Sequence, residues 1–172
     1  MWLSKRGFLS VGALLALVAC GFSPAYAPGG SGQMLQNAIL TAEPRDKSAF
    51  DLVERIEERL GPSDNPRYAL SYTISLKPVG VAISTANAIT RYNLTGAVEW
   101  ELSDVTTGAN LTGGKAENFT SYSATGSTVA GLAAKDDATQ RLMRIMADQI
   151  VTQLLATSGQ WAGRGMAEAA DG

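Results

Sequence analysis

The chain has 172 residues, with 14 Lys and Arg, 16 Asp and Glu, and no histidine. The absence of histidine excludes the common nucleophile triads, the common zinc sites and the most frequent general base, so we expect a protein that is not an enzyme and holds no metal or cofactor. The slightly acidic balance excludes general nucleic-acid binding, which needs clustered positive charge.

Residues 1–19 have the layout of a secretory signal peptide. Lys5 and Arg6 precede an uncharged apolar run of 12 residues that extends from Phe8 to Ala19. As a helix this run rises only about 18 Å, which is well short of the roughly 30 Å hydrocarbon core of a bilayer. We therefore interpret it as the core of a signal and not as a membrane span.

The apolar run ends in Leu17-Val18-Ala19-Cys20, which resembles the bacterial lipobox. The resemblance implies cleavage between Ala19 and Cys20 and acylation of the Cys20 sulfur. Two or more acyl chains give stable membrane attachment, because each buried CH₂ contributes about 0.8 kcal/mol. We expect a lipid-anchored mature protein; the alternatives are a free buried cysteine and an uncleaved anchor.

Removal of residues 1–19 leaves 12 basic and 16 acidic residues in a length that suits one domain. Since Cys20 is the only cysteine, packing without a disulfide must hold the domain together. Residues 20–33 are rich in Gly, Pro, Ser and Ala and predict a flexible tether. We expect the folded domain over residues 34–157 and a mobile tail, rich in Gly and Ala, over residues 158–172.

The first predicted elements are a short strand and a helix. The strand covers residues 38–42. The helix covers residues 48–60, where Ala49, Val53, Ile56 and Leu60 fall on one face. Ser48 and Asp51 resemble a capping box, and Gly61-Pro62 predicts the end of the helix.

Two segments with strict alternation predict a long hairpin. Residues 68–77 and 92–102 each place apolar side chains at every second position and mostly polar ones between them. The apolar members are Tyr68, Leu70, Tyr72, Ile74 and Leu76 in the first segment, and Tyr92, Leu94, Val98, Trp100 and Leu102 in the second.

The far end of this hairpin departs from the alternation. If the pattern continues through Pro78, the apolar residues Val79, Val81, Ile83 and Ile89 fall on the polar face. Either Pro78 marks a bulge that resets the register, or the tip presents apolar groups to a partner. The second alternative makes these four residues candidate contacts.

The remaining elements are a weaker strand over residues 111–122 and a long helix over about residues 129–156. The predicted fold is therefore α+β, with a four-stranded, mostly antiparallel sheet and two helices packed on one of its faces. The other face is left open and polar, which is typical of a binding module.

Several stretches, in this order and spacing, resemble the alphaproteobacterial form of the LptE family, the lipopolysaccharide-assembly lipoproteins. They are Cys20-Gly21-Phe22-Ser23-Pro24-Ala25-Tyr26, the alternating Tyr68–Tyr72 strand, Arg91-Tyr92-Asn93-Leu94, residues 133–138 with Arg141-Leu142, and Ala147-Asp148-Gln149-Ile150. The resemblance runs from Cys20 to about Ala156. It implies a plug inside the outer-membrane β-barrel LptD that helps the barrel assemble and assists lipopolysaccharide transport.

The resemblance also implies an outer-membrane location facing the periplasm, since Gly21 is not the Asp that retains lipoproteins in the inner membrane of enterobacteria. Lipopolysaccharide carries anionic phosphates, which Lys and Arg bind. Lys77, Arg91 and Lys115 are the candidate contacts by position, and ordinary solvated charges are the alternative interpretation. A competing assignment is an auxiliary lipoprotein of another envelope lipid transporter of the ABC type; an envelope hydrolase and a purely structural protein are further rivals.

Overall fold

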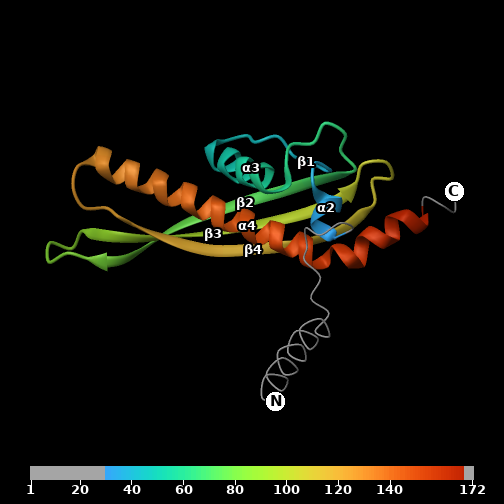
Figure 1. The fold of residues 1–172 in the computed structure, drawn as a ribbon. Helices are drawn as coiled ribbons and strands as arrows, with labels where there is room; N and C mark the ends of the chain where they lie inside the picture. Colours follow the sequence, from blue (N-terminus) through green and yellow to red (C-terminus); the bar gives the residue numbers. More distant parts are fainter. Residues whose placement is uncertain (1–29, 169–172) are drawn as a thin grey trace, which may run out of the picture. The chain divides into compact units, whose positions relative to one another are not determined.

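A computed structural model describes residues 30–168 (Figure 1). The predicted signal peptide, the cleavage site between Ala19 and Cys20, and the proposed lipid anchor lie outside the described residues. The chain forms two units, Met1–Met34 and Leu35–Gly172, and the fold described here is that of the second. The short helix α2 (Ser31–Leu35) spans the boundary and was not predicted.

The second unit contains a four-stranded sheet whose strand order follows the chain. Its strands are β1 (Ile39–Thr41), β2 (Tyr68–Ile83), β3 (Ile89–Asp104) and β4 (Asn110–Ser123). β1 pairs with β2 in parallel, whereas the β2–β3 and β3–β4 pairs are antiparallel. The predicted four-stranded, mostly antiparallel sheet and the predicted long hairpin of β2 and β3 are confirmed.

One face of the sheet is buried, as the period-two pattern requires. In β3 the side chains of Leu94, Val98, Trp100 and Leu102 are at most 3% exposed. The helix α4 (Thr128–Glu168) packs directly on this face. A Cβ atom at Gly96 would lie 2.9 Å from Leu142 Cδ2 and from Met146 Cε. A side chain at position 96 would therefore require the ends of these two side chains to shift.

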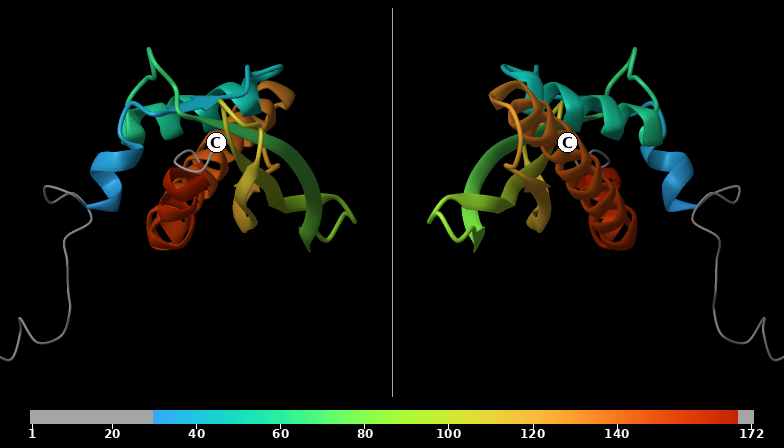
Figure 2. Two further views of the ribbon diagram at one scale, coloured as in Figure 1. Left: turned by 90° about the vertical axis from the view of Figure 1, so that its right-hand side faces the viewer. Right: turned by 90° about the vertical axis from the view of Figure 1, so that its left-hand side faces the viewer.

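The helix α3 (Lys47–Leu60) lies beside α4 (Figure 2). Both oxygens of Asp148 on α4 accept hydrogen bonds from Arg55, and Oδ1 also accepts one from Arg59 at 2.7 Å. The predicted end at Gly61 is confirmed, with a φ of 79° at this residue. The predicted cap at Ser48 was wrong, because Asp46 Oδ1 accepts the hydrogen bond of the Ala49 N–H at 2.8 Å.

The helix α4 continues to Glu168, through most of the segment that was predicted to be a mobile tail. Trp161 is 2% exposed and packs edge-on against Tyr68, with ring centroids 5.2 Å apart. Its Nε1 donates to Thr157 Oγ1 at 3.2 Å. Burial of a large apolar side chain contributes about 2–3 kcal/mol, which exceeds the roughly 1 kcal/mol that a glycine such as Gly159 costs inside a helix.

Candidate partner-binding surface

The face of the sheet opposite α4 is polar and exposed, and we call it the open face. Its side chains are Ser71, Thr73, Ser75 and Lys77 of β2, Thr95, Glu99 and Glu101 of β3, and Lys115, Glu117 and Ser121 of β4. Alternate residues of a strand point to opposite faces, so burial of the apolar set under α4 leaves this polar set outside. The open face predicted from the alternation is thus present.

Lys77, Arg91 and Lys115 are all exposed, but the structure does not bring them together. Lys77 lies opposite Thr95, and Lys115 lies opposite Glu99. Arg91 lies near the start of β3, opposite Ser123 at the end of β4. At about 3.4 Å per residue, Arg91 and Lys115 are roughly 27 Å apart along the strand direction. Any anion that these residues bind must either be extended or contact one cation at a time.

The three cations also differ in their pairing. Lys115 Nζ lies 2.5 Å from Glu117 Oε1, and this hydrogen bond is the main cause that raises the pKa of Lys115. Lys77 and Arg91 form no ion pair within residues 30–168. Lys77 and Arg91 are therefore the two with charge available for a partner.

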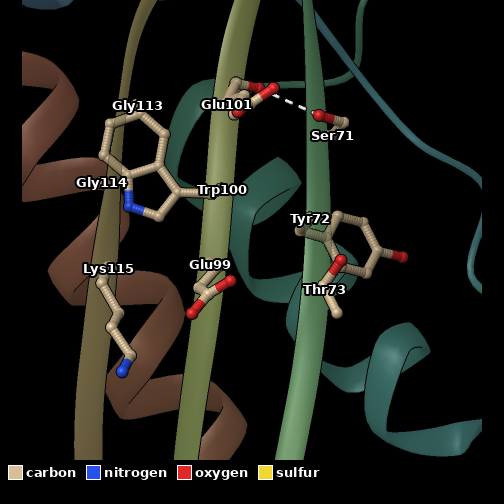
Figure 3. A pocket seen from close by; sticks show the side chains of 9 residues that line it. All are labelled: Ser71, Tyr72, Thr73, Glu99, Trp100, Glu101, Gly113, Gly114 and Lys115. Carbon is tan, nitrogen blue, oxygen red and sulfur yellow. Dashed lines mark hydrogen bonds between the residues drawn. The ribbon is translucent and has the colours of Figure 1, made fainter.

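A shallow hollow of about 580 Å³ opens on the sheet beside Lys115 (Figure 3). Its polar lining consists of Ser71, Thr73, Glu99, Glu101 and Lys115. Gly113 and Gly114 supply no side chains, and the Trp100 ring lies beside them (Figure 3). A Cβ atom at Gly114 would be 3.0 Å from Trp100 Cζ2, a tight contact that glycine avoids. The hydroxyl, carboxylate and ammonium groups suit a hydrated polar surface.

The apolar residues at the end of the hairpin form a second surface, the hairpin tip (residues 79–89). Val79, Val81, Ile83 and Ile89 are 41–65% exposed. Pairing with β3 stays in register past Pro78, and the first irregularity falls between Gly80 and Ala82. The bulge therefore lies at Val81 and not at Pro78, and it does not remove the apolar side chains from solvent.

The hairpin tip is a closed turn. Ser84 N donates to Ala88 O at 2.8 Å, and Ser84 Oγ accepts from Ala88 N at 3.2 Å. Asn87 has a φ of 60°, a conformation that asparagine tolerates better than most residues. Below the tip, the rings of Tyr92 and Tyr122 stack with centroids 5.3 Å apart. The exposed apolar groups are thus carried on a hydrogen-bonded hairpin.

The sequence interpretation missed three exposed apolar side chains near this end of the unit. Phe119 is 59% exposed and lies opposite Thr95, on the open face. Val129 and Leu132, in the first turns of α4, are 78% and 60% exposed. Figure 1 shows these turns and the hairpin tip at the same end of the unit. The alternation of β4 places Phe119 among polar residues and was the available signal.

Among residues 30–168 no helix is long and apolar enough to cross a membrane. In the same part of the chain, no three His, Cys, Asp or Glu side chains are grouped so that they would hold a metal ion.

A model of the LptE family, described as lipopolysaccharide-assembly, matches residues 35–154. The chain belongs to the LptE family. This confirms the family resemblance carried by the sequence stretches and identifies a family of non-enzymatic lipopolysaccharide-assembly lipoproteins of the Gram-negative envelope. A search of curated proteins found no match.

Solved structures of lipoproteins share the fold of this LptE-family chain. A putative lipoprotein from Caulobacter crescentus is 20% identical with a TM-score of 0.63, and the match covers 76% of this chain and 97% of that one. Rare lipoprotein B from Shewanella oneidensis is 15% identical with a TM-score of 0.55, over 70% and 94% of the two chains. Lipoprotein B from Nitrosomonas europaea is 12% identical with a TM-score of 0.54, over 74% and 87%.

Proposed function

We propose that this LptE-family protein is an outer-membrane lipoprotein that plugs the LptD β-barrel, helps it assemble and assists lipopolysaccharide transport to the cell surface. The observation that carries the proposal is an exposed apolar hairpin tip next to a polar open face, in a chain of a lipopolysaccharide-assembly family. A wide barrel has a water-lined interior, and a compact domain with a polar face is compatible with such a lumen.

The proposal assigns a separate role to each surface. The open face lies against the polar inner wall of the barrel, while α4 packs on the opposite face of the sheet. Val79, Val81, Ile83 and Ile89 contact an apolar part of the barrel, because an exposed apolar cluster of this kind is typical of a protein interface. Phosphates of lipopolysaccharide contact Lys77, Arg91 and Lys115 one after another during transport, in keeping with the spacing of these residues along the sheet.

The anchor completes the proposal. The signal peptide of residues 1–19 is removed, Cys20 becomes the first residue and carries the acyl chains, and residues 20–33 tether the domain. The domain then faces the periplasm from the outer membrane. Mass spectrometry of the native protein tests this part directly: an acylated Cys20 at the amino terminus is expected, and an unmodified Cys20 or an intact Met1 contradicts it.

Substitution of the hairpin tip tests the barrel contact. Threonine at Val79, Val81, Ile83 and Ile89 keeps the β-branched shape and strand propensity but adds a hydroxyl to each side chain. The expected result is strongly reduced recovery of the barrel with the affinity-tagged protein. A matched control replaces Leu40 and Val105, which are 51% and 48% exposed at the other end of the sheet, with threonine.

The control variant should recover the barrel as the unaltered protein does. Equal recovery with both variants would refute the role of the tip. Recovery of an inner-membrane ABC transporter in place of the barrel would refute the proposed partner as well. Depletion of the protein should in addition leave the barrel immature and lower the amount of lipopolysaccharide at the surface.

A further inference from the structure

The two outer edges of the sheet are treated differently by the rest of the chain. Side chains cap the β4 edge at three backbone groups. Lys115 O accepts from Gln153 Nε2 at 3.2 Å, Phe119 N donates to Asn118 Oδ1 at 2.8 Å, and Ser121 O accepts from Arg141 Nη2 at 3.4 Å. Unpaired edges invite pairing with another chain, and such caps reduce that tendency.

The β2 edge is occupied only at its beginning. β1 pairs with Tyr68–Leu70 and no further. Tyr68 N donates to Ala38 O at 3.0 Å, and Ala42 N donates to Leu70 O at 2.9 Å. Even-numbered residues of this part of β2 thus direct their N–H and C=O groups toward the outer edge, because successive residues of a strand alternate in direction.

Beyond Leu70, the residues that point to this edge are Tyr72, Ile74 and Leu76. Within the part of the chain that the structure describes, no hydrogen bond is formed by their backbone N–H or C=O groups. Three N–H and three C=O groups in a row are therefore left without a protein partner. An extended backbone is the ligand that satisfies such a row at its own spacing.

The surroundings of this edge leave space for an added strand. β1 ends at Thr41, and a cleft of about 610 Å³ follows the edge beyond it. Residues 42–46 and Ala49 line one side of this cleft, and residues 71–74 line the other. The cleft begins where β1 ends, so an incoming segment would continue the position that β1 occupies in the sheet.

The far part of the same edge is closed to pairing. Lys77 is exposed, Pro78 has no N–H to donate, and the bulge at Val81 disturbs the ladder. These are the devices by which natural proteins protect strand edges. Protection begins directly after Leu76, so the open segment has room for a partner strand of about five residues.

The side chains beside the open segment define the chemistry of the occupant. Ile74 is half-buried and Leu76 is 37% exposed on the apolar side of the sheet. Ser71, Thr73 and Ser75 are exposed on the open face. A strand that pairs here covers both sides, so its own residues should alternate between apolar and polar.

We propose that the β2 edge at Tyr72, Ile74 and Leu76 binds an extended segment of the barrel partner with alternating apolar and polar residues, as a fifth strand of the sheet. The inference rests on the proposed function for the identity of the partner. It adds a backbone-directed contact that is independent of the hairpin tip and of the three cations.

Amide hydrogen exchange on the unaltered protein is the first test. The rates at Tyr72, Ile74 and Leu76 are measured in the free protein and in the purified complex with the LptD barrel. New strand pairing should slow these three amides at least about tenfold in the complex. The amides of Thr73 and Ser75, which already pair with β3 in the free protein, serve as the internal reference and should change little.

A matched pair of variants at Ile74 is the second test. Ile74→Pro removes an outward N–H without removing a β2–β3 hydrogen bond, whereas Ile74→Thr keeps this N–H and the β-branched shape. Ile74→Pro should weaken barrel binding about tenfold relative to Ile74→Thr. Circular dichroism establishes that both variants fold, and the exchange measurement remains decisive if either does not.

The outcomes separate this inference from the proposed function. A complex that forms while the three amides exchange as in the free protein would overturn the inference and leave the barrel assignment intact. Failure of the unaltered protein to form any complex with the barrel would overturn both. Protection of the three amides together with selective loss of binding in Ile74→Pro would establish the added strand.

Discussion

Replacement of Trp161 by alanine should destabilise the whole domain, although the residue lies in a segment that sequence composition marks as a tail. Trp161 is 2% exposed, packs on Tyr68 at the start of β2 and donates a hydrogen bond to Thr157. Truncation of a buried Trp to Ala costs about 3–5 kcal/mol in a protein core. Near a helix end the cost is limited by local unfolding, so we expect about 2–4 kcal/mol.

Urea unfolding followed by circular dichroism measures this loss. With a slope of about 1–3 kcal/mol per molar urea, the midpoint should fall by about 1 M or more. Trp161→Phe is the matched control, because it keeps a ring against Tyr68 and loses only the hydrogen bond to Thr157, at a cost of about 1 kcal/mol. A midpoint for Trp161→Ala that equals that of the unaltered protein would refute the assignment of this segment to the folded domain.

Three further predictions concern charge. Asp148→Asn weakens the ion pairs by which Arg55 and Arg59 of α3 bind α4. Since these side chains are about one third exposed, the melting temperature should fall by only about 2–4 °C, and by less in 1 M NaCl. An unchanged melting temperature at low salt would exclude a stabilising role for these ion pairs. The Thr107 N–H, helped by the Thr106 N–H and the Thr107 hydroxyl, lowers the pKa of Asp104, so its stabilising contribution is complete above about pH 4 and is lost as the pH falls through the lower folded-state pKa. The stability difference between the unaltered protein and Asp104→Asn should therefore be present at pH 6 and shrink toward pH 2, and a difference that does not depend on pH would contradict this. Reversal of Lys77 or Arg91 to Glu should weaken lipopolysaccharide binding more than reversal of Lys115, which is already paired with Glu117. If all three variants bind lipopolysaccharide as tightly as the unaltered protein does, these residues do not form the proposed contact.

The sheet was predictable because its signal is local. The alternation in residues 68–77 and 92–102 specifies which side chains face the core, and the structure buries Leu70, Leu94, Val98 and Leu102 accordingly. The helix α3 was predictable for the same reason, from the spacing of Val53 and Ile56. Its cap was misplaced by two residues because Asp46 and Ser48 are both good capping residues.

The features that the sequence did not reveal depend on distant partners. Burial of Trp161 requires Tyr68, which lies in the first strand of the hairpin. The position of the bulge at Val81 depends on how β2 pairs with β3, and alternation within one strand does not contain that information. The contrast between the two sheet edges likewise arises from Gln153 and Arg141 of α4, which reach backbone groups of β4.

The central claim, that the domain contacts a barrel through its hairpin tip, is tested most directly by site-specific photocrosslinking in intact cells. A photoreactive residue is placed at Ile83 in the tip and, as the matched control, at Val105 at the other end of the sheet; both are exposed. Our account predicts an adduct with the LptD barrel from position 83 and little from position 105. Equal adducts from both positions, or an adduct from position 83 with an inner-membrane transporter, would contradict it.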